Sequence, residues 1–323
     1  MIEHVVVPAE RAGLELDEFL CLLFPECSKG WLRQQVRAGQ VLLDGQPAVP
    51  GKRLRSSQVV STEFDPEEAP KAPTAATDPI VVLFEDADVV AFDKAPGIAV
   101  EPERWFPDRP TVAASLLAWA QARGGDMRPR LAHRLDKDTS GVMLAAKHLE
   151  AERALRVAFE ERRVEKAYIA LVEGEFPDEA LSITKPLGPD RRQSGRMVVA
   201  SSGKPAVTEV RLVRPFRGYS LVEARPRTGR THQIRVHLAS EGFPLAVDPL
   251  YGRRTALRLS ELKAGYRAKK GREERPLIDR LTLHAERLSL GADVLGHPIE
   301  VEAPLPKDFE RVAKQLSKVR GWR

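Results

Sequence analysis

The sequence predicts an α+β protein with two domains, and three observations lead to that prediction. Segments with helical spacing and segments with strand-like alternation follow one another without the regular β-α repeat of a doubly wound sheet. Neither G-x-G-x-x-G nor G-x-x-x-x-G-K-[ST] is present, which argues against a nucleotide-dependent enzyme. A proline-rich segment without apolar periodicity separates a short part from a longer one. We therefore expect an N-terminal domain over residues 1–64, a linker over 65–79 and a larger domain over 80–323.

The N-terminal domain should be a small α/β module. Residues 15–24 carry apolar side chains at helical spacing, and residues 29–39 form a second candidate helix that ends at a glycine. Asp44 and Gly45 then form a two-residue hairpin turn between two short strands. Between residues 28 and 58 there are six cations and a single acid, Asp44. We expect one face of this domain to bind phosphates.

The larger domain begins with two apolar strands within residues 78–100, followed by a helix over 111–124. A strand after Gly141, a helix over 150–163 and an alternating strand over 166–176 come next. After Gly229, the sequence suits a helix from Thr231 to Gly242. The alternation of its apolar residues also suits a strand.

The composition is that of a soluble globular protein, with 42% hydrophobic and 30% charged residues among 323. No apolar run could span a bilayer and the N-terminus lacks a signal-peptide pattern, so we expect a cytoplasmic protein with no membrane partner. Cys21 and Cys27 have no partners at metal-ligand spacing, and His232 and His237 are not at the i, i+4 spacing of a helical metal pair. We predict reduced thiols and no metal.

The formal charge of +5 is unevenly distributed. Residues 185–235 hold 12 Lys and Arg against 3 Asp and Glu, and residues 251–280 hold 10 against 4. Such stretches are typical of a surface that binds a polyanion, although a solvated charged face has the same composition.

The densest polar cluster is the segment A-H-R-L-D-K-D-T-S-G at residues 132–141. It holds a histidine, two cations, two carboxylates and two hydroxyls, and it runs directly into the apolar V-M-L-A-A-K. It is either a solvated turn or a functional site. If it is a site, its two aspartates, Asp136 and Asp138, need to be distinguished.

Four ordered motifs answer that question by resemblance. H-R-L-D-x-x-T-S-G, K-A-Y-I-A-L-V-E-G, T-G-R-T-H-Q-I-R-V-H-L and the segment from Leu281 to Pro306 resemble the RluA-type pseudouridine synthase family, from about Leu14 to Phe309. Residues 14–62 resemble the S4-type RNA-binding domain that precedes the catalytic domain in such proteins. The resemblance implies a mixed, largely antiparallel sheet with a central cleft. It also implies isomerisation of uridine to pseudouridine in structured RNA without a cofactor.

The resemblance also implies roles for individual residues. Asp136 is the single catalytic carboxylate, because the reaction needs one acid beside the sugar whereas a hydrolase would pair two; Asp138 becomes a turn or surface residue. Tyr168 stacks on the target base and Arg235 pairs with Asp136. The base must leave its helix to react. Further RNA contacts are assigned to Arg134, Leu283, Arg230, His232, Lys29, Arg33 and Arg37.

Three alternatives remain open from the sequence. They are a non-catalytic RNA-binding protein of the same fold, a nucleosidase or glycosidase that uses Asp136 hydrolytically, and an S4-bearing assembly factor. The S4-like module favours 23S ribosomal RNA as substrate, while transfer RNA stays open, and a monomer is the default. Glu101 stands where many relatives have histidine, which leaves the preference for an RNA target less certain than the chemistry.

Overall fold

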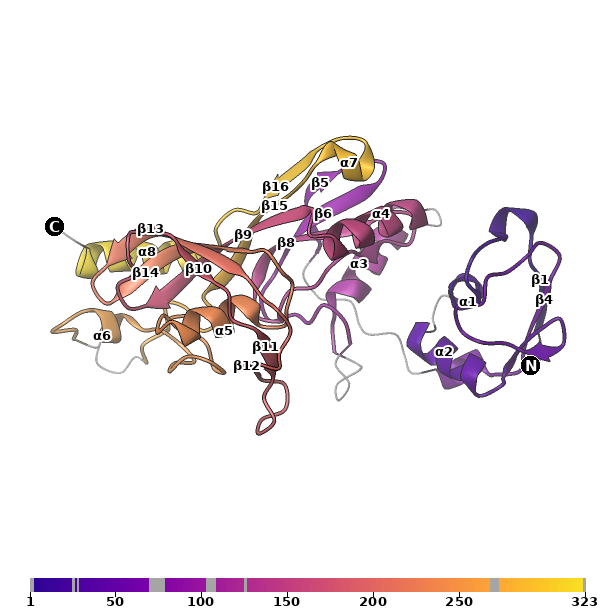
Figure 1. The fold of residues 1–323 in the computed structure, drawn as a ribbon, viewed down its shortest axis with the longest axis horizontal. Coiled ribbons are helices and arrows are strands. Elements are labelled where there is room, and N and C mark those ends of the chain that lie inside the picture. Colours follow the sequence, from indigo (N-terminus) through magenta and orange to yellow (C-terminus); the bar gives the residue numbers. More distant parts are fainter. Residues whose placement is uncertain are drawn as a thin grey trace. The chain divides into compact units, whose positions relative to one another are not determined.

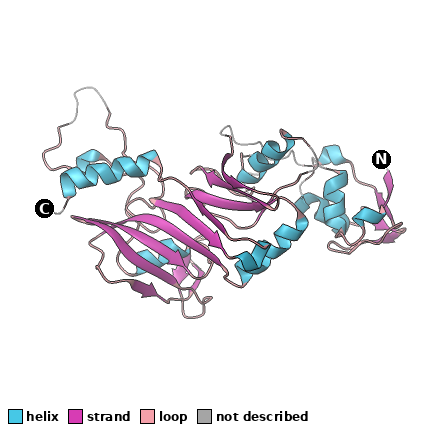
Figure 2. Ribbon diagram, turned by 90° about the horizontal axis from the view of Figure 1, so that it is seen from above, coloured by secondary structure: helices cyan, strands magenta, loops and turns pink. Residues whose placement is uncertain are grey.

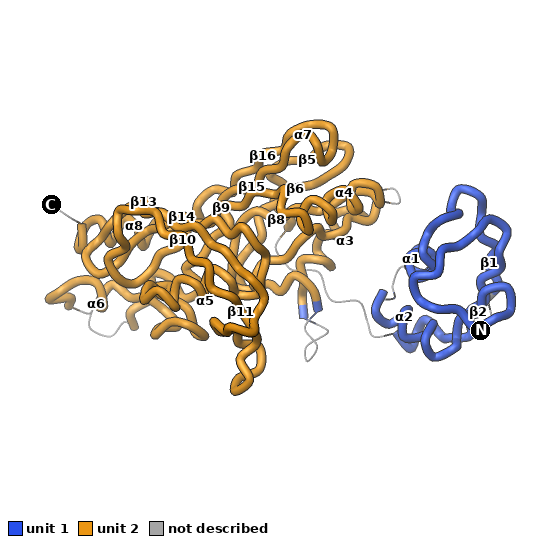
Figure 3. Tube along the Cα trace, viewed as in Figure 1, with its two compact units in different colours: residues 1–74, 102–109 blue, residues 75–101, 110–323 orange. Residues whose placement is uncertain are grey.

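The computed structural model describes residues 3–24, 27, 29–69, 79–102, 109–124, 127–267 and 273–321. The chain divides into two compact units, Met1–Thr74 with Pro102–Arg109 and Ala75–Glu101 with Pro110–Arg323 (Figure 3). One boundary, between Thr74 and Ala75, lies within the segment 65–79, and the other two lie at Pro102 and Arg109, outside it. Each unit is described by itself.

The first unit packs two helices against a small sheet with strand order β1-β4-β2-β3. Asp44 and Gly45, at φ 52° and 76°, make the predicted turn between β2 and β3. The core is apolar and includes Leu16, Leu20 and Leu32, each with no exposed surface. The elements are β1 (Glu3–Val6), η1 (Ala9–Arg11), α1 (Leu16–Leu23), α2 (Lys29–Arg37), β2 (Val41–Leu43), β3 (Gln46–Pro47) and β4 (Val59–Thr62).

The start of the segment predicted as a linker is folded onto the first unit. Asp65 caps a short 3-10 helix, η2 (Pro66–Glu68), by accepting a hydrogen bond from the Glu67 N–H at 2.9 Å. Ala69 then packs against the core of this unit. Residues 70–78, the rest of the segment, lie outside the described residues.

The second unit is built on one large mixed sheet, which Figure 1 shows running through it. Among the described residues its order is β10-β13-β14-β9-β15-β8-β6-β5, with β16 beside β15 and β7 beside β8. Its recorded pairs are antiparallel except β8 with β15, so the predicted mixed, mostly antiparallel sheet is confirmed. The strands of this unit are β5 (Val81–Glu85), β6 (Val89–Lys94), β7 (Arg130–Leu131), β8 (Ser140–Ala146), β9 (Val164–Glu173), β10 (Leu181–Ile183), β11 (Leu187–Pro189), β12 (Met197–Val199), β13 (Thr208–Phe216), β14 (Tyr219–Pro226), β15 (Leu283–Leu290) and β16 (Ile299–Glu302).

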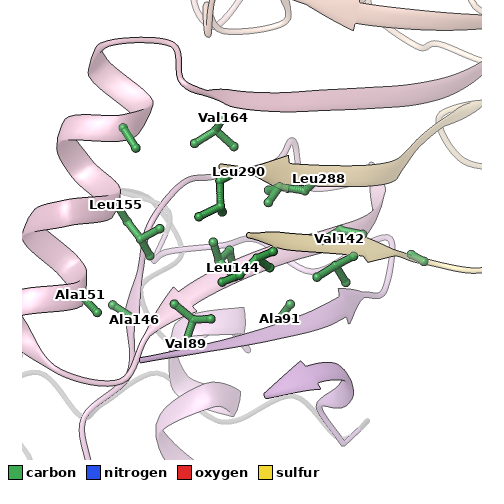
Figure 4. Close-up of a cluster of buried hydrophobic side chains, with 14 residues drawn as sticks. Val89, Ala91, Val142, Leu144, Ala146, Ala151, Leu155, Val164, Leu288 and Leu290 are labelled. Atoms are coloured by element: carbon green, nitrogen blue, oxygen red, sulfur yellow. The ribbon is translucent and has the colours of Figure 1, made fainter. Parts of the chain in front are cut away.

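Helices cover both faces of this sheet (Figure 2). Successive residues of β6 and β8 alternate between two cores, one under α4 and one under α3, which is why β8 reads as a continuous apolar run. Figure 4 shows the core under α4, where Leu155 meets Leu144 and Leu290. The helices are α3 (Val112–Gln121), α4 (Leu149–Glu160), α5 (Gln233–Ser240), α6 (Leu259–Leu262), α7 (Ala292–Leu295) and α8 (Lys307–Arg320).

One alternative left open by the sequence is resolved in this unit. The segment after Gly229, which suits either a helix or a strand, is the helix α5. Within the described residues, no helix has both the length and the apolar character needed to cross a bilayer.

Candidate active site

The polar segment 132–139 is a loop between β7 and β8, and Lys94 at the end of β6 holds it in place. Lys94 is 2% exposed, and its ammonium donates to the carbonyl oxygens of Ala95, Lys137 and Thr139 at 2.7 to 2.8 Å. Burial lowers the pKa of Lys94 to about 7, against the opposing charges of Asp138 and Asp136. A buried cation thus fixes the backbone on both sides of the turn that contains Asp138.

Gly141 explains the end of this motif. It has φ 116°, and a Cβ at this position would lie 2.1 Å from the carbonyl oxygen of Ala285. A side chain therefore cannot be accommodated where β8 and β15 approach one another in parallel. The glycine lets β15 lie beside the strand that directly follows the polar loop.

Asp136 lies within this loop and pairs with Arg235 of α5, 99 residues further along the chain. Arg235 Nη1 donates to Asp136 Oδ2 at 2.8 Å. In the described part of the chain no hydrogen bond reaches the other oxygen, Oδ1. The Asp136 side chain is 24% exposed, whereas that of Arg235 is only 7% exposed. One carboxylate oxygen is thus fixed and the other remains available.

Arg235 is itself anchored by Asp248, a residue that sequence reasoning missed. Its Nε and Nη2 donate to Asp248 Oδ2 and Oδ1 at 2.8 and 2.9 Å, and Asp248 has no exposed surface. Asp248 Oδ1 also accepts from the N–H groups of Leu250 and Tyr251 at 2.9 and 3.1 Å. Burial disfavours the charged guanidinium, but its bonds to Asp248 and Asp136 raise the pKa of Arg235 above its usual range.

His232 brings a second polar group to Asp136. It precedes α5 with φ 55°, a left-handed conformation that is uncommon outside glycine. Its Nδ1 lies 2.8 Å from Tyr251 Oη, and its Nε2 lies 3.9 Å from Asp136 Oδ1. Burial lowers the pKa of His232, partly against the charge of Asp136, so the imidazole is neutral at pH 7.

Tyr168 lies on β9, between Ala224 of β14 and Ala285 of β15. It packs against the two apolar cores that lie under α3 and α5. Burial, together with the charge of Asp136, raises the pKa of Tyr168 far above its usual value, so the phenol keeps its proton. Leu283 belongs to the core under α5 and is only 4% exposed.

Four further residues considered from the sequence lie in this unit: Arg134, Arg230, Asp138 and Glu101. Arg134 is exposed, and its charge contributes to the lowered pKa of His232. Arg230 is half-buried and donates from Nε to the Pro205 carbonyl at 3.1 Å. Asp138 lies in the turn after Asp136, as expected, and its negative charge favours the protonated form of Lys94. Glu101 is exposed at the edge of a segment that the structure does not describe.

The three cations assigned to RNA binding in the first unit differ from one another. Arg33 forms an ion pair with Asp17, which is fully buried, and Lys29 lies 3.6 Å from the same carboxylate and 3.5 Å from Glu18. Burial alone would raise the pKa of Asp17, but the charges of Lys29 and Arg33 hold it below its usual value. Arg37, at the end of α2, is exposed. Two of the three cations therefore also stabilise the fold.

One group in the described residues has metal-ligand composition. Asp86, Asp88 and His297 bring candidate ligand atoms within 4.8 Å of one another. Asp86 Oδ1 accepts from the N–H groups of Asp88 and Val89, its Oδ2 contacts His297, and Asp88 pairs with His148. Because these hydrogen bonds already occupy the carboxylates, the geometry is that of a capped turn.

Sequence reasoning singled out Asp136, Tyr168, Arg235 and His232, and the structure brings them into one neighbourhood. Lys94, Asp248 and Tyr251 were missed. A signal existed for Asp248, since an acid that directly follows the apolar run P-L-A-V is a candidate for a buried charge that needs a partner. The partner, Arg235, is 13 residues away, and only the fold shows it.

This arrangement suits chemistry at an electron-poor carbon. It offers a carboxylate with one unbonded oxygen, a guanidinium that keeps the carboxylate oriented, a neutral imidazole and a protonated phenol. Asp248, the carboxylate that shares Arg235 with Asp136, is not free to activate a water, because it is buried and both of its oxygens accept hydrogen bonds. The geometry favours covalent or base catalysis by one acid over hydrolysis by two.

Comparison with known proteins agrees with this geometry. The family model for RNA pseudouridylate synthase matches residues 88–240. A ribosomal large subunit pseudouridine synthase D from Xanthomonas campestris pv. campestris is 37% identical, covering 98% of this chain and 92% of its own. Its counterpart from Pseudomonas aeruginosa is 33% identical, covering 94% and 92%.

A solved structure shares the fold as well. Human RNA pseudouridylate synthase domain containing 1 superimposes with a TM-score of 0.55 at 26% identity, covering 72% of this chain and 86% of that one. The sequence match to the bacterial enzymes extends over nearly the whole chain. The chain therefore belongs to the RluA-type RNA pseudouridine synthases and is an enzyme of that family.

Proposed function

We propose that this enzyme converts one or more uridines of 23S ribosomal RNA to pseudouridine, with Asp136 as its only catalytic carboxylate. Relatives from Xanthomonas campestris and Pseudomonas aeruginosa that match most of the chain are named as ribosomal large subunit enzymes, which supports this RNA target. The S4-like first unit and the basic segments of the second unit provide cations for phosphate contacts.

The observation that carries the proposal is the asymmetric bonding of Asp136. Oδ2 is held by Arg235 while Oδ1 is unbonded, so Oδ1 attacks C1′ of the ribose, or removes a proton from the sugar, as the C1′–N1 bond breaks. The freed uracil then rotates and bonds through C5 to C1′, as the bond to Oδ1 breaks or the sugar regains its proton, and the C5 proton leaves to solvent. Arg235 keeps the carboxylate ionised when RNA covers the site and excludes water. Asp248 shares the same guanidinium, and its negative charge keeps Arg235 from fully neutralising Asp136.

The remaining residues act on the base in this proposal. The target uridine leaves its stack, which costs a few kcal/mol that new contacts recover. Arg134, exposed beside the site, fills the space that the base leaves. Tyr168 stacks on the extruded uracil. Its raised pKa supports stacking as a neutral phenol over direct removal of the C5 proton by a phenolate.

Release of tritium from C5-labelled uridine in transcribed 23S ribosomal RNA tests the activity. The parental enzyme should release tritium and form pseudouridine, while Asp136→Asn should release almost none at unchanged RNA affinity. Asp138→Asn is the matched control, two residues away in the same loop, and should keep most of the rate. Release of free uracil would indicate hydrolysis, and equal rates for both variants would remove Asp136 from the mechanism.

The RNA target needs a separate experiment. Pseudouridines should be mapped in ribosomal and transfer RNA from cells with and without the gene. Loss of modification at defined 23S positions supports the proposal, whereas loss confined to transfer RNA contradicts the assigned substrate. Restoration by the parental gene, but not by Asp136→Asn, would link the missing modification to catalysis.

A further inference from the structure

We propose that His232 and Asp136 together bind the 2′-hydroxyl of the target ribose, which makes His232 a specificity-determining residue for RNA over DNA. The inference rests on the proposed function, since it places Asp136 Oδ1 beside the sugar. It begins from an interaction that pairing with Arg235 leaves unexplained, the 3.9 Å separation between His232 Nε2 and Asp136 Oδ1.

The hydrogen bonds around Tyr251 favour one tautomer of His232. The phenolic oxygen accepts from the Met197 N–H at 2.8 Å and lies 2.8 Å from His232 Nδ1. A tyrosine hydroxyl has one hydrogen to donate, and in the described part of the chain Nδ1 is the acceptor recorded for it. Since the imidazole is neutral, the other nitrogen, Nε2, carries the hydrogen.

The site therefore presents one donor beside one acceptor. Nε2–H and Oδ1 are too far apart to bond directly at 3.9 Å. A single oxygen at ordinary hydrogen-bond lengths of about 2.8 Å from each atom fits between them. That oxygen must both accept a hydrogen and donate one, which describes a hydroxyl group.

The ribose supplies such a group where the proposed chemistry requires it. When Oδ1 approaches C1′, the 2′-hydroxyl on the adjacent carbon is the nearest group able to accept and donate at once. The O2 carbonyl of uracil, also close to C1′, accepts but cannot donate. The 2′-hydroxyl is also the group by which proteins tell RNA from DNA.

The backbone of His232 supports a maintained position rather than an incidental contact. Its left-handed conformation costs about 1 kcal/mol or more, and such positions cluster at functional sites. Tyr251 packs its ring edge-on against His232 and lies 5.0 Å from the Arg235 guanidinium. Tyr251 therefore contacts both the imidazole and the guanidinium.

A double-mutant cycle on enzyme and substrate tests the inference. The probe is a synthetic stem-loop RNA around the uridine mapped in 23S RNA, with uridine or 2′-deoxyuridine at that one position. His232→Asn is the main variant, because asparagine tolerates the left-handed conformation but does not reach the hydroxyl. His297→Asn, a half-exposed histidine on the same unit, is the control. Single-turnover tritium release and RNA affinity are measured for each pair.

The parental enzyme and His297→Asn should both react at least about tenfold faster with uridine than with 2′-deoxyuridine. In His232→Asn the rate with uridine should fall about tenfold, and the ratio of the uridine rate to the 2′-deoxyuridine rate should shrink to within about threefold. The reason is that without the imidazole the 2′-hydroxyl has lost its partner, so removing the hydroxyl as well has little further effect. Tyr251→Phe removes the hydroxyl that lies beside His232 Nδ1, so either tautomer of the imidazole becomes accessible and the ratio should be intermediate. Equal ratios in the parental enzyme and His232→Asn overturn the inference while leaving the proposed function intact. No release from the uridine probe by the parental enzyme contradicts both.

Discussion

Both units of this enzyme contain an arginine held by a fully buried aspartate, yet the two pairs differ in what they leave available. In the first unit, Arg33 is bound to Asp17, and Lys29 adds a second cation to the same carboxylate. In the second unit, Arg235 uses two nitrogens for Asp248 and still reaches Asp136 with a third. The Arg33–Asp17 pair stabilises the first unit, whereas the Arg235–Asp248 pair also binds Asp136, a carboxylate that is partly exposed to solvent.

The difference shows that the charge of a side chain does not by itself identify an active-site residue. A planar guanidinium with five donors can bind two carboxylates at once, and which of them is buried decides their roles. Within the described residues, the Asp248 carboxylate accepts four hydrogen bonds and anchors the guanidinium, while the Asp136 carboxylate accepts one and keeps an unbonded oxygen.

The largest expected effect comes from Asp136, the partly exposed carboxylate that Arg235 binds. Asp136→Asn should lower the single-turnover rate at least about a thousandfold, which corresponds to ~4 kcal/mol, because the amide can neither attack the sugar nor take its proton. Thermal unfolding should change little, since Asp136 is partly exposed. A rate within tenfold of the parental enzyme would contradict the comparison.

Substitution of Asp248, the buried partner of Arg235, should instead change the stability of the fold strongly. Asp248→Asn leaves Arg235 buried with one carboxylate, and the loss of a partner in a buried pair costs about 3 to 5 kcal/mol. Urea unfolding of the full chain should show this loss in the second unit. Stability unchanged within about 1 kcal/mol would mean that Asp248 is not the anchor.

Arg235→Lys separates charge from geometry. Lysine keeps the charge but cannot bridge both aspartates, so we expect about a hundredfold loss of rate, or ~2.7 kcal/mol, with only modest loss of RNA affinity. Kinetics at saturating RNA, with affinity measured by filter binding, distinguish the two effects. A weakened affinity at a normal rate would instead make Arg235 a phosphate contact.

Acid should affect the two units in different pH ranges. Burial lowers the pKa of His284 to about 4 and that of His133 to about 3. Unfolded histidines bind protons near pH 6.5, so between these values the unfolded state takes up more protons and stability falls as pH falls. Asp17, whose pKa is lowered, loses its contribution only below its ordinary value of 3.8.

Hydrogen exchange at pH 7 and pH 5 should therefore show weakened protection in the second unit first. The loss from His284 should amount to about 2 kcal/mol at pH 5, and His284→Gln should remove that part of the pH dependence while the part due to His133 remains. Earlier loss in the first unit would contradict this order.

The smallest effects concern the cations of α2. Arg33→Ala should destabilise the first unit by about 1 to 2 kcal/mol, because Asp17 loses a partner. Arg37→Ala should leave stability unchanged, weaken RNA binding severalfold, and reduce the slope of log affinity against log salt by about 0.9. Unfolding curves and salt titrations of both variants make the comparison direct. Equal effects on RNA affinity would show that Arg33 also contacts phosphates.

Local patterns predicted the helices α1 to α4 and the strands β2, β3, β5, β6, β8 and β9, and in α1 and α4 the apolar spacing reflects the face that each buries. They gave no prediction for β10 to β16 or for α6, α7 and α8. The family motifs singled out Asp136 and Arg235. Local patterns could not predict that Asp248 binds Arg235 or that Lys94 holds the loop, since both depend on contacts between distant segments. Nor could they decide whether α5 was a helix, because it is buried on nearly every side and lacks an amphipathic pattern.

The parallel pairing of β8 with β15 has a consequence for biosynthesis. Ser140 at the start of β8 lies beside His284 of β15, 144 residues later, and β15 is also the strand that connects β8 to β9. While a ribosome is still translating the middle of this chain, the two halves of the large sheet have no strand to join them. The loop with Asp136 and the strand with Tyr168 therefore reach their mutual positions only after most of the polypeptide has emerged. A nascent chain still attached to a ribosome would thus remain inactive towards RNA until its synthesis is almost complete.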